Sequence, residues 1–326
     1  MSYRIGSFNI RKLSYATKDE DLDGDNKNVS RDFTAIGEII RNQSSHCDVV
    51  ALQEILNENV LKLLFPEGCG WKYSWAPSRS KMDDSSEGYA FAWNERRIVP
   101  VCEPMIWTQY KYDDVLGNYG LIRHPYYGRF TPSGSACGGP YVEFRLINTH
   151  IRYNPKINNL ADASSIELRK REFKVLSEQI LAKLTKRIYG NEMTDPHTTF
   201  QKITILLGDY NLNLKSSPAS SPYVEEIVTI ADGNSIREIV TVQNELTTLR
   251  KRREVNSSTG DVEWKFEGLA NNYDHFTYDS TFFGDQGISA APGVINAVHI
   301  FKGGDYEKYW REISDHLPII LDIDFV

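Results

Sequence analysis

The chain has 326 residues, 40% of them hydrophobic and 12% aromatic, which allows one sizeable buried core and excludes a disordered chain. The formal net charge of −7 excludes histone-like and repressor-like binders, whose affinity comes from many phosphate contacts. It still permits an enzyme that holds a few phosphates through a metal and a local basic patch.

The first half of the chain alternates between strand and helix patterns. We expect strands at 4–10, 48–53, 89–94 and 141–150, and helices at 32–43 and 55–65. The strand at 141–150 is the clearest, because hydrophobic residues from Val142 to Leu146 stand at every second position. Between the first strand and the first helix, Asp21 to Asp25 is similar to a calcium loop. Its glycine stands at the fourth position and Asp32 at the twelfth, so we interpret it as a solvated loop.

The second half begins with the longest predicted helix, 165–189, whose apolar residues from Phe173 to Ile188 form one stripe. The charged residues of its first half are interpreted as a solvated face. Further strands are expected at 203–207, 273–278 and 317–325, and two at 246–266 around the turn sequence Asn256 to Gly260. No repeat or linker divides the chain. We therefore predict a single domain, 1–326, of two packed sheets covered by helices.

Cysteine usage and apolar runs limit the class of protein further. The four cysteines (Cys47, Cys69, Cys102 and Cys137) contain no C-x-x-C pair, which argues against a zinc site of usual spacing and a disulfide framework. No signal region precedes the first strand, and no apolar run approaches the roughly 20 residues of a membrane span. We expect a soluble, cytoplasmic protein.

Polar side chains stand where the apolar strands end. In chain order they are Asn9, Glu54, His150, Asp209 and Asn211. Strands that run the same way would place them on one rim, and Asp315 and His316 would join them if the last strand ran the opposite way. Each residue alone could be a turn former, a cap or a buried histidine. Together they predict one concave cluster of carboxylate, amide and imidazole groups.

Five sequence motifs resemble those of the endonuclease/exonuclease/phosphatase superfamily, in the order of that family. They are S-F-N-I at 7–10, L-Q-E at 52–54, N-T-H at 148–150, G-D-Y-N at 208–211 and S-D-H-L-P at 314–318. The likeness is greatest to deoxyribonuclease I-like nucleases. It implies an α/β (α+β) fold, a four-layer α/β/β/α sandwich with two packed, mostly antiparallel sheets. The disulfides and calcium sites of secreted members are not found, and His275 follows Asp274 where the family usually has Arg.

The resemblance also implies roles for individual residues. Catalysis would depend on His150, His316, Asp209, Glu87 and Asp274, with Glu87 orienting His150 and Asp274 orienting His316. Asn211, Arg123, Asn9 and Tyr273 would bind substrate. Glu54 would be the first ligand of Mg²⁺, helped by Asn9 and Asp315, and Mn²⁺ could replace it. We expect His316 as general base and His150 as general acid, with Asp209 as the other candidate base.

A nucleic acid substrate, with DNA favoured, is the leading prediction. The basic run Arg250 to Arg253 on an expected hairpin arm would reach a phosphate backbone, or would be an ordinary exposed strand. A phosphoinositide or sphingolipid phosphatase or phosphodiesterase of the same superfamily is the alternative. Residues 272–275 lack the W-C-D-R signature of inositol 5-phosphatases, and abasic-site endonucleases carry a different motif there. A catalytically dead binding module is disfavoured because every expected metal and histidine position is occupied.

Overall fold

The structure is a computed structural model. It describes residues 2–15, 17–18, 28–41, 47–78, 87–108, 121–134, 141–153, 162–187, 200–215, 223–232, 235–260 and 262–325. The calcium-loop-like residues 21–25, Cys137 and the last residues of the predicted helix 165–189 lie outside these ranges.

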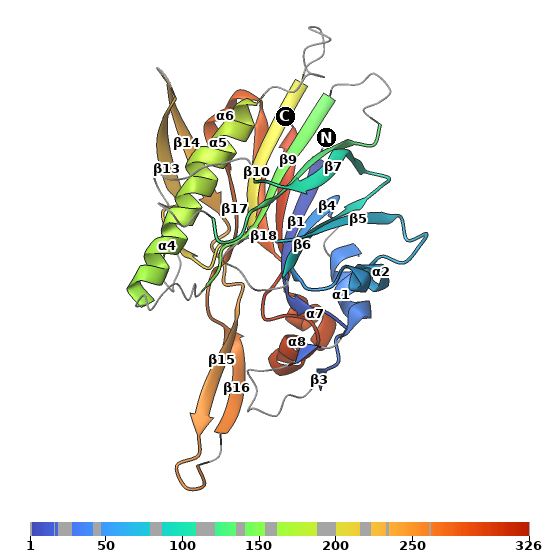
Figure 1. Cartoon of the computed structure of the whole chain (residues 1–326), viewed down its shortest axis with the longest axis vertical. Helices are drawn as coiled ribbons and strands as arrows, with labels where there is room; N and C mark the ends of the chain where they lie inside the picture. The colour runs from blue at the N-terminus through green and yellow to red at the C-terminus, as the bar shows by residue number, and fades with distance from the viewer. Residues whose placement is uncertain are drawn as a thin grey trace.

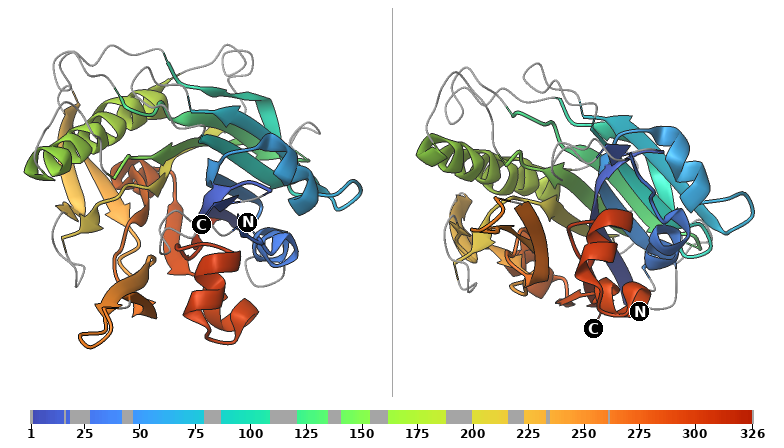
Figure 2. Two further views of the ribbon diagram at one scale, coloured as in Figure 1. Left: turned by 60° about the horizontal axis from the view of Figure 1, so that its bottom comes forward. Right: turned by 90° about the horizontal axis from the view of Figure 1, so that it is seen from below.

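Two large sheets lie face to face (Figures 1 and 2). The six-stranded sheet has the order β18 (Ile288–Val294), β19 (Ile319–Phe325), β1 (Ser2–Leu13), β4 (Val49–Ile55), β6 (Gly88–Asn94) and β5 (Trp71–Pro77). The seven-stranded sheet has the order β13 (Ile227–Asp232), β14 (Ser235–Val242), β17 (Asp274–Asp279), β10 (Phe200–Asp209), β9 (Tyr141–His150), β8 (Tyr126–Pro132) and β7 (Ile98–Ile106). Among these strands only β1–β4 and β9–β10 pair in parallel, so both sheets are mostly antiparallel.

Helices cover the outer face of each sheet (Figure 2). Over the six-stranded sheet lie α1 (Phe33–Arg41), α2 (Leu61–Leu64), α7 (Ala297–Lys302) and α8 (Tyr306–Glu312), with a 3₁₀ turn at Glu58–Val60 before α2. Over the seven-stranded sheet lie α4 (Asp162–Lys174), a π-helical segment (Val175–Leu181) and α5 (Ala182–Lys186). The short α6 (Ser280–Asp285) precedes β18.

Alternation along the strands explains the layers. In β4, Val49 and Ala51 face the other sheet, whereas Val50 and Leu52 face the helices. In β10, Ile205 packs between the sheets and its neighbour Leu206 packs under the π-helical segment. Three apolar layers therefore separate helices, sheet, sheet and helices. The predicted four-layer α/β/β/α sandwich is confirmed.

Smaller elements complete the described chain. The strands β15 (Leu249–Val255) and β16 (Val262–Leu269) form a hairpin arm that projects away from the sandwich (Figure 1). Two short ladders join β2 (Thr17–Lys18) to β3 (Asn28–Val29) and β11 (Asn213–Leu214) to β12 (Tyr223–Val224). None of the helices among the described residues has the length and apolar character needed to cross a membrane.

Two predicted helices differ from the observed ones. The helix expected at 55–65 begins later, because Ile55 still pairs in β4 with Gly88. The long helix expected at 165–189 contains π-helical turns from Val175 to Leu181, so its apolar stripe turns relative to the first half. Six strands of the two large sheets were not predicted: β5, β7, β8, β13, β14 and β18.

Candidate active site

The two parallel strand pairs bring their C-terminal ends to one rim. In the six-stranded sheet Asn9 lies opposite Gln53, and in the other sheet Asp209 lies opposite His150. Gly208 makes the second pairing possible. It has φ +135°, and a Cβ there would lie 2.0 Å from the carbonyl oxygen of Thr149, so only glycine fits.

A buried polar bridge fixes the separation of the sheets at this rim. The side-chain nitrogen of Gln53 donates to Asn148 Oδ1 at 2.7 Å, and Asn148 Nδ2 donates to the carbonyl of Leu52 at 3.0 Å. Both amide side chains are fully buried, so their polar groups cannot bond to water and need partners within the protein. Two residues of the strand-end motifs therefore join the sheets and do not face the site.

Glu54 is presented by an irregular end of β4. Its backbone has φ +60°, a conformation that non-glycine residues rarely adopt and that often occurs at functional sites. Glu54 Oε1 accepts from Asn9 Nδ2 at 3.0 Å, and Oε2 accepts from the backbone N–H of Lys12 at 2.9 Å. The Lys12 contact exists because β1 bulges between Asn9 and Leu13.

Asn9 lies between the two central carboxylates. Its Nδ2 also donates to Asp209 Oδ2 at 3.0 Å, and its Oδ1 accepts from the backbone N–H of Arg11. The amide nitrogen, which cannot ligate a cation, therefore faces Glu54 and Asp209. This orientation differs from the metal-ligand role expected for Asn9 and makes it a residue that positions carboxylates.

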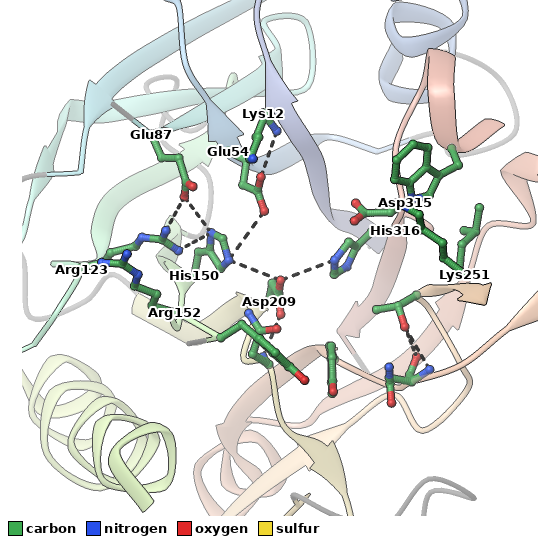
Figure 3. Close-up of a pocket in the computed structure, with 17 residues that line it drawn as sticks. Lys12, Glu54, Glu87, Arg123, His150, Arg152, Asp209, Lys251, Asp315 and His316 are labelled. Atoms are coloured by element: carbon green, nitrogen blue, oxygen red, sulfur yellow. Dashed lines mark hydrogen bonds and ion pairs between the residues drawn. The ribbon is translucent and has the colours of Figure 1, made fainter. Parts of the chain in front are cut away.

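Asp209 stands at the centre of the cluster (Figure 3). Its Oδ2 lies 3.5 Å from His150 Nε2 and 3.6 Å from His316 Nε2, and its Oδ1 accepts from the backbone N–H of Asn211 at 2.8 Å. Burial raises the pKa of Asp209 to about 6, against the opposing effect of the two histidines. A carboxylate with a pKa in this range can accept a proton near neutral pH.

His316 is held by a second buried carboxylate. Its Nδ1 lies 2.7 Å from Asp274 Oδ2, and Asp274 is itself opposite Asp209 in the β17–β10 pairing. Burial alone would lower the pKa of His316, but the charges of Asp274 and Asp209 outweigh it and hold that pKa well above the usual value. These carboxylates therefore favour the protonated ring of His316, whose Nε2 lies 3.6 Å from Asp209 Oδ2.

His150 has the opposite electrostatic environment. Arg123 places a guanidinium nitrogen 2.8 Å from His150 Nδ1 and another 2.7 Å from Glu87, whose carboxylate is 3.4 Å from the same ring nitrogen. An arginine can only donate, so Nδ1 must accept and the proton of the neutral ring is on Nε2. Burial and then the charge of Arg123 lower the pKa of His150 to about 4. The structure thus inserts Arg123, expected to bind phosphate, between Glu87 and His150.

Replacing Arg123 with Ala is expected to raise the pKa of His150, because the guanidinium charge that opposes protonation would be lost. The ring would then be free to adopt either tautomer. A histidine titration by ¹H–¹⁵N NMR measures both the pKa and the tautomer. Arg96→Ala, an exposed arginine in the β6–β7 turn, is the control. An unchanged titration of His150 in Arg123→Ala would contradict the contact.

The donor set suits a hard divalent cation. Glu54 and Asp209 each offer a carboxylate oxygen, and these oxygens and a ring nitrogen of His150 lie within 4.8 Å of one another. Asp315 lines the same cavity, and its buried Oδ1 has no hydrogen-bond partner. The carboxylates of Glu54 and Asp209, with the unsatisfied oxygen of Asp315 in the same cavity, fit Mg²⁺ or Mn²⁺, which prefer oxygen ligands.

The cluster lines an open cavity of about 540 Å³. Asn211 and Tyr273 also line it, as expected, whereas Tyr89 and Tyr210 are core residues. Lys251, from the basic run at 250–253, lines the cavity, whereas sequence reasoning missed several other lining side chains: Lys12, Arg152, Tyr153, Thr248, Asn271 and Trp310. Lys12, Arg152 and Tyr153 directly follow predicted strand ends, so their position was a usable signal.

No family model matches this chain, and neither does any curated protein. Solved structures do match over nearly the whole chain. An endonuclease/exonuclease/phosphatase family protein from Bacteroides thetaiotaomicron is 15% identical, covering 100% of this chain and 98% of its own, with a TM-score of 0.51. TDP2 from D. rerio, complexed with a single-strand DNA product, is 14% identical, with 99% of each chain covered and a TM-score of 0.50. A mannosyl-6-phosphatase from Bacteroides thetaiotaomicron is 14% identical, covering 99% and 100%, with a TM-score of 0.51. The chain therefore has the fold of the endonuclease/exonuclease/phosphatase superfamily.

Proposed function

We propose that this chain is a divalent-metal-dependent phosphodiesterase that cuts nucleic acid, with DNA as the favoured substrate, in the manner of deoxyribonuclease I-like nucleases. The observation that supports it most is the environment of Asp209, a buried carboxylate flanked by two histidines whose pKa values are shifted in opposite directions. Glu54 and Asp209 come from different sheets, so we also propose that residues 1–326 act as one catalytic domain.

Glu54 would be the principal ligand of Mg²⁺ or Mn²⁺, with Asp315 as a further oxygen donor. When bound, the cation would neutralise negative charge on the phosphate and on the leaving oxygen. Asn9 would hold the carboxylates of Glu54 and Asp209 apart through its two donated hydrogen bonds. This geometry keeps both carboxylates in place without a cation ligand from Asn9.

Asp209 is our proposed general base. Its raised pKa, about 6, suits a group that takes a proton from water near neutral pH. Asp274 and Asp209 raise the pKa of His316 and so disfavour the neutral ring that a general base needs. We accordingly assign His316 to donate a charged hydrogen bond to a phosphate oxygen, which replaces the sequence-based expectation of His316 as base.

His150 would donate its Nε2–H to the phosphate as a neutral imidazole. A ring whose pKa is about 4 holds no extra proton to transfer at neutral pH, so the role of general acid expected for His150 is not favoured. Arg123 and Glu87 would act through His150 by fixing its tautomer. One hydrogen of the Asn211 amide bonds the carbonyl of Ile151 at 2.8 Å, and we assign the second to a phosphate oxygen.

The aromatic side of the cavity favours a nucleoside-bearing substrate. Tyr153 is 56% exposed at the cavity wall, and its ring centroid lies 6.3 Å from that of Tyr273. Exposed rings of this kind stack on bases or sugars. The similar TDP2 structure contains single-strand DNA product, which supports the same substrate class. The mannosyl-6-phosphatase structure is equally similar, so a phosphomonoester is the alternative substrate class that the experiment must test.

The test is incubation of the full chain with plasmid, single-stranded DNA, RNA, soluble phosphoinositides and a sugar phosphate, with Mg²⁺ and with EDTA. We expect Mg²⁺-dependent cleavage of nucleic acid and no cleavage in EDTA. Release of inorganic phosphate from the phosphoinositide or sugar phosphate alone would favour the phosphatase. Equal cleavage in EDTA would refute the proposed metal dependence.

Glu54→Gln is expected to raise the Mg²⁺ concentration for half-maximal cleavage by at least about 10-fold, because a neutral amide binds a hard cation less well than a carboxylate. The amide keeps only one acceptor oxygen, so it can accept from Asn9 Nδ2 or from the backbone N–H of Lys12, but not from both as the carboxylate does. A Mg²⁺ titration of initial rates measures the shift. Glu67→Gln, on an exposed turn, is the control. An unchanged Mg²⁺ midpoint would exclude Glu54 as a ligand.

A further inference from the structure

The two faces of the β15–β16 arm have different chemistry. Residues opposite each other in an antiparallel pair point to the same face, and the pairs Lys251–Phe266, Arg253–Trp264 and Val255–Val262 therefore share one. The intervening pairs, Arg252–Lys265 and Glu254–Glu263, lie on the other. We name the first group the cationic–aromatic face.

The acidic residues of these pairs all lie on the opposite face. There Arg252 forms an ion pair with Glu254, and Lys265 forms one with Glu263 at 2.7 Å. The charges of that face therefore compensate each other. On the cationic–aromatic face the six paired residues include two cations and no carboxylate, although the whole chain is acidic.

The cationic–aromatic face continues into the active-site cavity. The ring of Phe266 lies 5.1 Å from that of Trp310, and Lys251 Nζ lies 4.5 Å from the Trp310 ring and 4.1 Å from the Trp264 ring. Lys251 (Figure 3) lines the cavity of Asp209. Trp310 lines the same cavity, and the guanidinium of Arg11 covers its ring at 3.3 Å. Alternating cations and aromatic rings thus extend from the catalytic cluster along the arm.

We propose that the cationic–aromatic face binds the single-stranded part of a nucleic acid whose cleaved phosphate lies beside Asp209. Trp264 would stack on an unpaired base, and Lys251 and Arg253 would contact phosphates. At about 3.4 Å per residue, the strand from Leu249 to Val255 is about 20 Å long, enough for several nucleotides. This inference extends the proposed function by naming the form of the substrate and the element that selects it.

Two observations favour a single strand over other anionic partners. A duplex buries the faces of its bases in its own stack, so Trp264 would have no base to stack on. The tip of the arm, Asn256 to Gly260, is polar and has no large apolar side chain to enter a lipid surface. Charge and aromatic character together fit unpaired nucleic acid.

The experiment measures binding of the full chain to a fluorescent single-stranded DNA of about 12 nucleotides by anisotropy, in EDTA and at several salt concentrations. Trp264→Ala is expected to weaken binding by about 10-fold without changing the salt dependence, because stacking releases no counterion. Arg253→Ala is expected to weaken binding and to reduce the slope of log Kd against log salt by about 0.7, the contribution of one phosphate contact on a single strand.

Arg252→Ala is the matched control, because this arginine is the neighbour of Arg253 on the opposite face and is paired with Glu254. It should leave affinity and salt slope unchanged. Equal losses in Arg252→Ala and Arg253→Ala, or no loss in Trp264→Ala, would overturn the inference. So would binding of phosphatidylserine vesicles without binding of DNA. Since no turnover occurs in EDTA, a chain that binds as expected but never cleaves would support this inference and contradict the proposed catalysis.

Discussion

Asp209→Asn is expected to reduce cleavage of nucleic acid by about two to four orders of magnitude, the usual effect of losing a general base. An amide has nearly the same shape as the carboxylate and can still accept the backbone hydrogen bond from Asn211. It cannot take a proton from water. The loss should therefore appear in kcat, measured under saturating substrate and Mg²⁺, with a smaller change in KM.

Asp324→Asn makes the same chemical change at an exposed position near the end of β19 and should leave the rate unchanged. The folded state of Asp209→Asn is checked by its thermal unfolding midpoint. Burial disfavours the ionised carboxylate of Asp209, which favours the amide, whereas the amide loses the hydrogen bond that Asp209 Oδ2 accepts from Asn9, so we expect only a small change in this midpoint. Near-normal turnover in Asp209→Asn would show that another group is the general base.

The cluster was predictable because each of its residues follows a short apolar run. The runs that became β4 and β10 are buried on both faces and are therefore almost wholly apolar, so the polar residues at their ends stand out in the sequence. Once β1 pairs with β4 and β9 pairs with β10 in parallel, Glu54, His150 and Asp209 must share a rim. The antiparallel β19 then brings in His316 from the opposite end of the chain.

The contacts between side chains were not predictable in the same way. A motif predicts Arg123 in the site but does not say that its guanidinium contacts His150 Nδ1, because that depends on how the two side chains are oriented. The role of Asn9 likewise depends on which end of its amide faces Glu54. Competing hydrogen bonds set such orientations. Here the backbone N–H of Arg11 donates to the amide oxygen of Asn9, which turns the amide nitrogen toward Glu54.

The unpredicted strands lack a clear period of two. β7 and β13 are edge strands. Apolar residues such as Met105 and Ile227 are exposed there, so apolar and polar positions do not alternate regularly along these strands. The arm was predicted from its turn sequence, yet the pairing of Arg253 with Trp264 was not. A shift in register near Leu249 decides which residues share a face, and a single-residue slip would exchange the two faces.

The electrostatic asymmetry of the two histidines has one structural source. His150 faces a guanidinium and His316 faces a carboxylate, although both lie within 3.6 Å of the same oxygen of Asp209. Asp209 can therefore ionise beside one positive neighbour and one neutral neighbour. Two charged histidines would stabilise its anion further and lower its basicity, so the Arg123 contact preserves a carboxylate able to accept a proton.

His316→Gln is expected to reduce cleavage by about two to four orders of magnitude as well, because the charged hydrogen bond to the phosphate would be lost. Unlike Asp209→Asn, this change should also destabilise the fold. Asp274 is 1% exposed, and removing one partner of a buried ion pair costs about 3–5 kcal/mol. Thermal unfolding would show the loss, and a rate measurement below the unfolding temperature would separate it from catalysis.

The double variant His316→Gln/Asp274→Asn distinguishes the two effects. Neutralising Asp274 removes the buried unpaired charge, so most of the lost stability should return, whereas cleavage should stay low because the imidazolium is still absent. Asp274→Asn alone should lower the pKa of His316, whose elevation depends on that carboxylate, and NMR titration of the ring measures it. If the double variant regained both cleavage and stability, His316 would stabilise the fold without contacting the phosphate during cleavage.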